Sequence, residues 1–209
     1  MTLKRCFDVV IAALLLLALL PLILVIAIAV AVGSGRPVLF RAYRVGRGGS
    51  TFPMLKFRTM KVGASGPAIT GRNDPRITRV GAVLRRSKLD ELPQLLNVLS
   101  GDMSLVGPRP EDGRFVARYT AQQREVLTVR PGMTSPAAIL YRDEEKLLAA
   151  GAPNFEHLYE TTIMAAKLTL DLDYIRKRNF WRDIVILYQS VAVVLRPRRA
   201  EELPTNAGS

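Results

Sequence analysis

Residues 9–32, VVIAALLLLALLPLILVIAIAVAV, contain no charged side chain. A membrane hydrocarbon core about 30 Å thick is crossed by about 20 apolar helical residues, so this stretch is long enough to enter or cross a membrane. Pro21 lies at its centre, where proline removes a backbone N–H donor and clashes with the carbonyl of Leu17. The stretch therefore predicts a membrane helix that kinks or breaks at Pro21.

Basic residues flank this apolar stretch on both sides. They are Lys4 and Arg5 before it, and Arg36, Arg41, Arg44 and Arg47 after it. Lys and Arg are enriched on the cytoplasmic side of membrane segments, so the symmetry favours a re-entrant helix with both ends in the cytoplasm. A single spanning helix is the alternative. A cleaved signal peptide fits less well, because the run is too long and Gly33–Arg36 is a poor cleavage site.

The composition narrows the choice of partner. The 209 residues carry a formal charge of +12 and have a pI of about 10.4, which points to an anionic partner: nucleic acid, an anionic lipid surface or a phosphorylated substrate. Nucleic acid is disfavoured, because no zinc-finger spacing, RNP-like motif or basic region joined to heptads is present. With Cys6 and His157 as the only Cys and His, a Cys/His zinc site is excluded. His157 also lacks a nucleophile-elbow context, and we interpret it as a surface helix residue.

The remaining chain predicts an α+β fold that is mostly helical. A short β-hairpin is expected from Val38–Arg44 and Thr51–Arg58, and a loop from Lys61–Arg76. Helices are expected over Ile77–Arg86, Glu111–Leu127, Tyr141–Leu148, Leu158–Lys177 and Phe180–Leu195. We divide the chain into a membrane hairpin over residues 1–35, a cytoplasmic domain over residues 36–200 and a disordered tail over residues 201–209.

The helix predicted over Phe180–Leu195 is amphipathic. Its polar face carries Arg182, Asp183, Gln189 and Ser190, and its apolar face includes Trp181 and Tyr188. Arginines follow directly at residues 196, 198 and 199. This pattern fits a helix in the plane of the membrane interface, in contact with phospholipid. An ordinary core helix with a basic end is the alternative.

The segment Arg85–Pro110, RRSKLDELPQLLNVLSGDMSLVGPRP, carries the candidate chemistry. Asp90 and Glu91 are adjacent carboxylates directly after a basic cluster. Asp90 is expected to cap the following helix, with Pro93 in its first turn. Capping alone would account for both acids, but their basic surroundings favour a functional role. We interpret Lys56, Arg58, Arg85, Arg109 and Arg130 as phosphate-binding candidates, because each lies in or beside a rigid or strand-like segment.

Several blocks of the chain strongly resemble the bacterial sugar transferase family, the monotopic phosphoglycosyl transferases. They are Arg5–Asp8, Lys56–Met60, Asp74–Thr78, Leu89–Leu95, Gly101–Pro110 and Arg130–Gly132. The resemblance runs from Lys4 to about Leu195. It implies transfer of a sugar-1-phosphate from a UDP-sugar to a polyprenyl phosphate, usually undecaprenyl phosphate, with release of UMP. It also implies a Mg²⁺ cofactor and a place at the cytoplasmic face of the bacterial inner membrane, at the first membrane step of a glycan pathway.

The resemblance assigns roles to the two acids. Asp90 matches the family's nucleophile, which forms a phosphosugar-aspartate, and Glu91 matches the metal-binding acid. We take both carboxylates as candidate Mg²⁺ ligands. The family's membrane helix typically breaks at Ser-Pro, whereas this chain has Leu20-Pro21 and lacks the hydroxyl that could bond a freed carbonyl. The sequence after Gly132 also departs from many relatives, so no sugar preference is carried over.

Two other functions compete with this interpretation. A membrane-anchored scaffold would use the basic surface to hold anionic lipid and would tolerate loss of the Asp90 carboxylate. A glycosyltransferase that moves only the sugar would release UDP rather than UMP. The motif blocks favour the phosphoglycosyl transferase over both.

Overall fold

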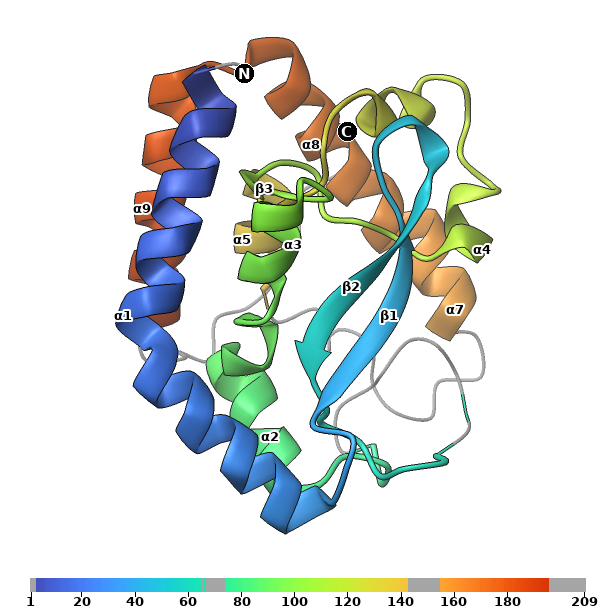
Figure 1. The fold of residues 1–209 in the computed structure, drawn as a ribbon. Coiled ribbons are helices and arrows are strands. Elements are labelled where there is room, and N and C mark those ends of the chain that lie inside the picture. The colour runs from blue at the N-terminus through green and yellow to red at the C-terminus, as the bar shows by residue number, and fades with distance from the viewer. Residues whose placement is uncertain (1–2, 65, 67–73, 143–154, 196–209) are drawn as a thin grey trace.

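The computed structural model describes residues 3–64, 66, 74–142 and 155–195. The described chain is mostly helical, with one long apolar helix, a β-hairpin and a second small sheet (Figure 1). After α1 (Leu3–Ser34), the helices and helical turns are η1 (Arg47–Gly49), α2 (Arg79–Ser87), η2 (Leu89–Glu91), α3 (Gln94–Ser100), α4 (Gly113–Val116), η3 (Gln123–Thr128), α5 (Pro136–Leu140), α7 (Phe155–Leu158), η4 (Tyr159–Met164), α8 (Ala165–Lys177) and α9 (Phe180–Leu195). The predicted mostly helical α+β class is confirmed.

Helix α1 continues without interruption through Pro21. Figure 1 shows that it bends part-way along, so that its second half runs toward α2. A proline inside a helix removes one hydrogen bond and displaces the preceding turn, which produces a kink when neighbouring hydrogen bonds survive. The predicted two-helix hairpin is therefore not confirmed: α1 is one bent helix, and it is long and apolar enough to cross a membrane by length and composition.

One side of α1 packs against the rest of the protein. Ala12 and Val30 are fully buried, and Ile26 nearly so, in clusters shared with β2, α2 and α3. Apolar side chains on the opposite side are exposed; Leu17 is 72% exposed, and Val25 and Ile28 are each 63% exposed. Helix α1 is therefore attached to the domain along one stripe and presents an apolar stripe outward.

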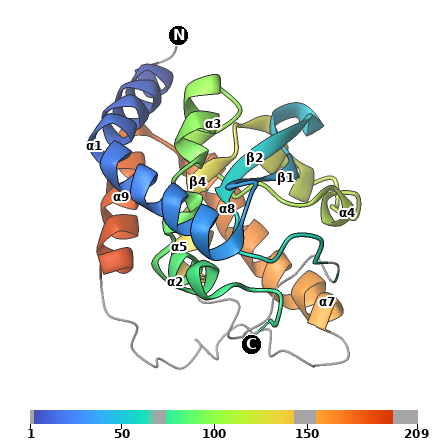
Figure 2. The same ribbon diagram turned by 60° about the horizontal axis from the view of Figure 1, so that its bottom comes forward.

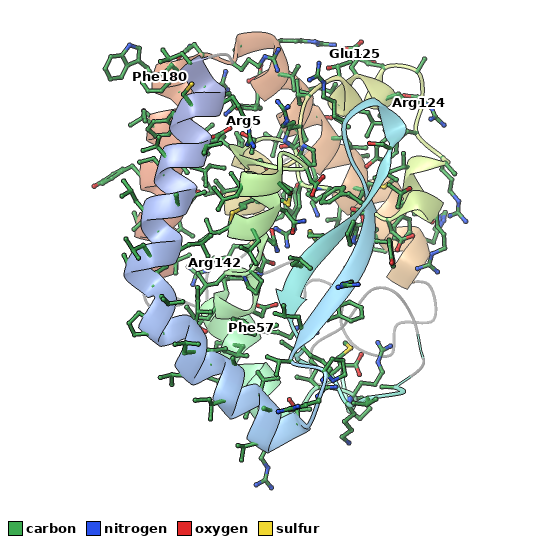
Figure 3. All side chains as sticks on the ribbon, viewed as in Figure 1. Arg5, Phe57, Arg124, Glu125, Arg142 and Phe180 are labelled. Carbon is green, nitrogen blue, oxygen red and sulfur yellow. The ribbon has the colours of Figure 1, made fainter. Side chains whose placement is uncertain are left out.

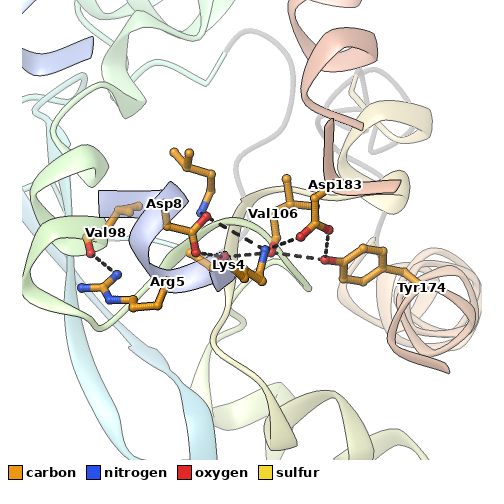
Figure 4. Close-up of polar contacts among 9 residues, drawn as sticks. Lys4, Arg5, Asp8, Val98, Val106, Tyr174 and Asp183 are labelled. Carbon is orange, nitrogen blue, oxygen red and sulfur yellow. Dashed lines mark hydrogen bonds and ion pairs between the residues drawn. The ribbon is translucent and has the colours of Figure 1, made fainter. Parts of the chain in front are cut away.

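Polar contacts hold the first turns of α1 to the domain (Figure 4). The Lys4 ammonium lies 2.6 Å from a carboxylate oxygen of Asp183 in α9, and the buried Asp8 carboxylate accepts a 2.7 Å hydrogen bond from Ser104. Arg5 points from α1 toward α3, where it donates to two carbonyls at the end of that helix (Figure 3). These contacts place the start of α1 beside α9 and β3 (Ser104–Val106).

The other end of α1 is also tied to the domain. Arg58 donates to the carbonyls of Ser34 and Gly35, and the Ser34 hydroxyl lies 3.0 Å from that of Thr78. The last carbonyls of a helix have no partner within the helix, so a guanidinium at this position both satisfies them and complements the helix dipole. Both ends of α1 therefore contact one and the same polar domain.

Strands β1 (Leu39–Val45) and β2 (Thr51–Phe57) pair antiparallel, which confirms the predicted hairpin. The hairpin turns at η1, where Gly48 adopts a φ of 68°, a conformation that glycine accepts without strain. Phe52 and Met54 are buried against α3, and Lys56, two residues further on the same face, is directed to the same side of the hairpin. The hairpin thus supplies a wall from which Lys56 projects.

The second sheet consists of β3 and β4 (Gly132–Thr134), which pair in parallel. Gly107 and Gly132 pass so closely that a Cβ on Gly132 would lie 2.1 Å from the Gly107 nitrogen. Only glycine permits this approach, which is closed by hydrogen bonds from Gly107 to Thr134 and from Gly132 to Pro108. The turn that carries Arg109 is thereby fixed against β4.

Two of the predicted helices are confirmed by the structure, and a third is wrong. The helix predicted over Ile77–Arg86 is α2, shifted by one or two residues, and the prediction over Leu158–Lys177 is confirmed by η4, a π-helical turn, followed by α8. The continuous helix predicted over Glu111–Leu127 is wrong, because the segment contains only α4 and the 3-10 turn η3. Asp112 caps α4 by accepting from Arg114, which starts a new short element where the prediction assumed continuity.

Three further predictions fall wholly or partly outside the described residues: half of the loop Lys61–Arg76, the helix beyond residue 142 and the tail 201–209.

Helix α9 spans Phe180–Leu195 as predicted and lies beside α1 in both views (Figures 1 and 2). Two of its polar side chains turn inward: Asp183 is buried between Lys4 and Tyr174, and Ser190 bonds Thr134, whereas Gln189 is exposed. Ile186 packs in the core, but several other apolar side chains turn outward. Trp181 and Tyr188 are each 76% exposed, followed by Val191, Val185 and Val194. This arrangement is the reverse of a soluble protein's surface helix and continues the apolar stripe of α1.

Candidate active site

The two candidate acids lie on a tight turn between α2 and α3. Helix α2 ends at Ser87, and Lys88 adopts a left-handed conformation, with a φ of 60°, that redirects the chain into η2. Asp90 and Glu91 lie in η2 itself. The N-cap of α3 is Pro93, so the prediction that Asp90 caps this helix is wrong. The carboxylate of Asp90 is therefore not used as a helix cap.

The Asp90 side chain is buried, and one of its two oxygens has no hydrogen-bond partner among the described residues. The residue is 6% exposed, and the oxygen without a partner is Oδ1. Burial raises the pKa of the Asp90 carboxyl and the adjacent Glu91 charge raises it further, while Lys56, Lys88 and Arg85 act in the opposite direction. A buried acceptor without a hydrogen bond is costly, so Oδ1 of Asp90 is a candidate to bind a ligand or a metal ion.

Glu91 has the opposite surroundings. Both of its oxygens accept from the guanidinium of Arg109, at 3.1 Å for Oε2, and Oε1 also lies 3.2 Å from the Lys56 ammonium. Burial alone would raise the pKa of Glu91, but Arg109 and Lys56 outweigh it and hold that pKa well below its usual range. Burial in turn lowers the pKa of Lys56, and Glu91 counteracts this. Glu91 is thus a fixed anion between two cations.

These residues line an open cavity of about 1040 Å³. Cationic side chains dominate the wall that surrounds the two acids; they are Lys56, Arg58, Arg85, Lys88 and Arg109. Apolar side chains of α1 and α9, including Leu15, Leu187 and Val194, line another part of the same cavity. The cavity therefore joins a basic pocket to the α1–α9 side of the molecule.

The five predicted phosphate-binding residues do not all meet here. Lys56, Arg85 and Arg109 line the cavity beside the acids. Arg58 also lines it, but its Nη2 is engaged by the end of α1, while its Nε and Nη1 lack partners among the described residues. Arg130 does not line the cavity; its Nε donates to the Gly101 carbonyl at 2.8 Å.

Other residues of the cavity gave little sequence signal. Lys88 is recognisable only as part of the basic cluster before Asp90. Glu111 directly follows the Pro-Arg-Pro turn, which could have marked it. Tyr159 and Lys167 lie about 50 residues further along the chain, and only the three-dimensional fold brings them to the same cavity.

The donor set is suited to a magnesium ion that also binds a phosphorylated substrate. Mg²⁺ prefers one or two carboxylates together with phosphate oxygens and water. Asp90 offers an unpaired oxygen, and Glu91 offers a second carboxylate that would have to exchange contacts with Lys56 or Arg109. Among the described residues no cluster of three or more His, Cys, Asp or Glu forms an all-protein metal site.

The fold and the site together define a protein in which an outward-facing apolar helix adjoins a basic cavity built around two carboxylates. The chain belongs to the bacterial sugar transferase family, whose sequence model matches residues 1–197. It is 42% identical to a UDP-glucose:undecaprenyl-phosphate glucose-1-phosphate transferase of Caulobacter vibrioides, over 92% of this chain and 69% of that protein.

Two further relatives are similar over most of this chain. A UDP-glucose:undecaprenyl-phosphate glucose-1-phosphate transferase of Escherichia coli is 39% identical, over 90% of this chain and 39% of that protein. An undecaprenyl-phosphate galactose phosphotransferase of Salmonella typhimurium is 36% identical, over 93% of this chain and 40% of that protein. The chain thus spans about two fifths of the length of these two relatives.

Proposed function

We propose that this protein transfers a sugar-1-phosphate from a UDP-sugar to undecaprenyl phosphate and releases UMP. The observation that carries the proposal is the buried, unpartnered Oδ1 of Asp90 beside a Glu91 held by two cations, in a basic cavity. The names of the relatives support the donor and acceptor classes. The product would be a diphosphate-linked lipid sugar, the first membrane-bound intermediate of a bacterial glycan.

The reaction proceeds in two displacements. In the first, a carboxylate oxygen of Asp90 attacks the β-phosphorus of the UDP-sugar; the bond from this phosphorus to the bridging oxygen breaks, and UMP leaves with that oxygen. In the second, a phosphate oxygen of undecaprenyl phosphate attacks the same phosphorus and displaces Asp90, whose carboxylate is restored. A covalent intermediate of this kind divides one difficult transfer into two easier steps.

The environment of Asp90 favours this role. A carboxylate with a raised pKa is more basic, and one without a hydrogen-bond partner sheds less solvation when it attacks. Lys56, Arg85 and Lys88 keep it ionised and offset the repulsion between a carboxylate and a diphosphate. Arg109 has a planar guanidinium that can hold phosphate oxygens in two parallel hydrogen bonds, in addition to holding Glu91.

Mg²⁺ is the cofactor that this donor set fits. Asp90 and Glu91 would hold it, with the remaining positions filled by phosphate oxygens and water. The ion would neutralise charge that develops on the diphosphate as UMP leaves. Arg109 and Lys56 would keep Glu91 ionised for this purpose, since they hold its pKa low.

The arrangement of α1 supports a monotopic, re-entrant placement with the domain on one side of the membrane. The 32 residues of α1 extend about 48 Å, yet both ends contact the same polar domain through Lys4 and Ser34. A spanning helix would carry its ends to opposite faces of the bilayer. The outward apolar stripes of α1 and α9 would instead enter one leaflet, and the basic flanks of α1 favour the cytoplasmic face of the inner membrane.

The apolar end of the cavity supports a route for the lipid acceptor. Leu15 of α1 and Leu187 and Val194 of α9 line the same cavity as Asp90. A polyprenyl chain lying along α1 and α9 could keep its tail in the membrane while its phosphate reaches the basic wall. The water-soluble donor would enter from the hairpin side.

Nucleotide release tests the proposal. The purified protein would be mixed with Mg²⁺, undecaprenyl phosphate and a panel of UDP-sugars, with Asp90→Asn as the control. UMP released with at least one donor, and absent with the variant, is the expected result. Release of UDP would indicate simple glycosyl transfer, and a variant that matches the native protein would exclude Asp90 as the nucleophile.

A further inference from the structure

A second acidic pair, Glu111 and Asp112, lines the same cavity as Asp90 and Glu91. Among the described residues, these two pairs supply all the carboxylates of the cavity wall. The first pair is surrounded by cations that suit phosphates. The second pair lies in mixed surroundings, where carboxylate, hydroxyl and ammonium groups face the cavity together. A carboxylate repels a phosphate but accepts hydrogen bonds from hydroxyl groups, so the two walls suit different parts of one ligand.

Glu111 is held in place by contacts from three elements. Its Oε2 accepts a 2.5 Å hydrogen bond from the Tyr159 hydroxyl, and its Oε1 accepts from the backbone N–H of Asp112 at 2.9 Å. Arg44 of β1 lies 3.5 Å from the same Oε1. Each carboxylate oxygen can accept more than one hydrogen bond, so Glu111 retains capacity for a ligand while its side chain stays fixed.

Tyr159 and Lys167 complete this wall. The Lys167 ammonium lies 5.4 Å from the centre of the Tyr159 ring, over its face, and both residues line the cavity. Tyr159 begins η4, a π-helical turn, which is a kind of distortion that occurs frequently at functional sites. The wall therefore combines an acceptor, Glu111, with a donor, Lys167, at positions that burial keeps rigid; Lys167 is 9% exposed.

The chain fixes the separation between the two walls. Glu111 follows Arg109 by two residues, which span at most about 7 Å of extended chain. Arg109 holds Glu91, and the carbonyl of Glu111 accepts from Val45 of β1 at 3.0 Å. A ligand whose phosphate lies at Arg109 would therefore place the next group of the molecule beside Glu111.

We propose that Glu111, positioned by Tyr159 and accompanied by Lys167, binds hydroxyl groups of the donor's sugar and determines which sugar is accepted. The inference rests on the proposed transfer of a sugar-1-phosphate and extends it to donor choice. The ribose hydroxyls and the uracil N–H of the nucleotide are also donors to a carboxylate, so the test below measures the affinity for UDP as well. The relatives' names include both glucose and galactose transferases, whose sugars differ only in the direction of one hydroxyl group.

The test compares two variants with a matched control. Glu111→Gln keeps the shape of the side chain but removes its charge, and Tyr159→Phe removes only the hydroxyl that holds Glu111. The control is Glu125→Gln, on η3, whose side chain is 50% exposed and lies outside the cavity (Figure 3). Steady-state kcat/KM would be measured with UDP-glucose and with UDP-galactose. Calorimetry would measure the affinities for UDP-glucose and for UDP with each substitution placed in the Asp90→Asn background, in which the first displacement cannot occur.

We expect Glu111→Gln to lower kcat/KM for the preferred donor by about 10- to 100-fold, the size expected for a hydrogen bond to a charged group. In Glu111→Gln, the ratio of kcat/KM for UDP-glucose to kcat/KM for UDP-galactose should move toward one. Tyr159→Phe should move this ratio part of the way. The affinity for UDP should stay within about twofold of the native value. The protein's preference for binding UDP-glucose over UDP should fall together with the kcat/KM ratio, and this preference is measured without turnover.

Two results would overturn the inference. An unchanged ratio of kcat/KM for the two UDP-sugars would exclude Glu111 from sugar recognition and would not contradict the proposed reaction. An equal loss of affinity for UDP and UDP-glucose would assign Glu111 to the fold or to binding of the nucleotide. If the native protein released no UMP with any donor, the proposed function would fail. If its affinity for UDP-glucose were also no greater than its affinity for UDP, the proposed recognition of the sugar by Glu111 would fail too.

Discussion

The cavity around Asp90 and the outer face of α1 and α9 differ in where their charged side chains lie. In the cavity, carboxylates and cations are buried together, and Glu91 is held between Arg109 and Lys56. On the outer face, Asp183 turns inward to Lys4, and apolar side chains such as Trp181 face outward. Under the proposed function, the first region would bind a charged, water-soluble donor and the second would face lipid. A protein that joins a nucleotide sugar to a lipid phosphate needs both, side by side.

The largest expected effect is the loss of turnover when Asp90, at the centre of the charged cavity, is replaced. Asp90→Asn removes the proposed nucleophile, so turnover should fall by about 10⁴-fold or more, measured as UMP release. The folded protein should not lose stability, because the substitution removes a buried carboxylate whose Oδ1 has no hydrogen-bond partner among the described residues. A variant that loses activity and also melts at a much lower temperature would indicate a structural role for Asp90.

The next effect separates Glu91 from its strongest partner. Arg109→Ala should lower kcat by about 10²- to 10³-fold, because it removes the proposed phosphate ligand and one of the two cations that contact Glu91. Arg109→Lys should recover only part of this loss, since an ammonium cannot reproduce the two parallel contacts. Full activity of the lysine variant would show that charge alone matters at this position.

A further prediction concerns Asp171, a buried acid that should make the stability of the protein depend on pH. Burial raises the pKa of Asp171 to about 7, although Ser135 and Lys167 act against this. Its ordinary pKa is 3.8, so between about pH 4 and pH 7 the unfolded chain binds fewer protons than the folded one, and stability falls as the pH rises.

Asp171→Asn should therefore flatten the fall in melting temperature between pH 5 and pH 8, measured by thermal unfolding. The native protein and the variant should differ little at pH 5, where Asp171 is largely protonated in the fold. A parallel fall in both proteins would mean that other groups set the pH dependence.

The smallest effect tests the apolar region. Val185 is 52% exposed on the outward face of α9, so Val185→Asp should weaken binding to phospholipid vesicles by about tenfold while the melting temperature in detergent stays unchanged. The control is Gln122→Asp, which introduces the same negative charge at an exposed position directly before η3 and should bind nearly as the native protein does. Equal vesicle binding by native protein and Val185→Asp would remove α9 from the membrane interface.

Local patterns predicted the elements that depend on nearby residues. Helix α9 has the predicted bounds, and the strands of the hairpin β1–β2 agree with the prediction to within one residue at each end, because alternation, turn glycines and amphipathic spacing are local signals. The segment Glu111–Leu127 was predicted as one helix and is not, because Asp112 starts a short separate turn. The bend of α1 also departs from the predicted hairpin, since surviving hydrogen bonds and the domain packed along α1 keep the helix continuous.

The site was predicted in part. Resemblance to a family singled out Asp90 and Glu91, and the fold brings Lys56, Arg85 and Arg109 to them. The directions of other arginines depend on partners distant in sequence. Arg58 turns toward the free carbonyls at the end of α1, and Arg130 turns to Gly101 outside the cavity. No local pattern contains these partners, so the sequence could propose the cations but could not assign their contacts.

The account depends most directly on a covalent bond between Asp90 and the sugar phosphate. The purified protein would be incubated with Mg²⁺ and its preferred UDP-sugar, without lipid acceptor, and examined by intact-protein mass spectrometry and peptide mapping. We predict a mass gain of one sugar phosphate on the peptide that contains Asp90, its loss when undecaprenyl phosphate is added, and no such gain in Asp90→Asn. UMP release that requires the lipid acceptor, with no modified peptide at any time, would contradict the account.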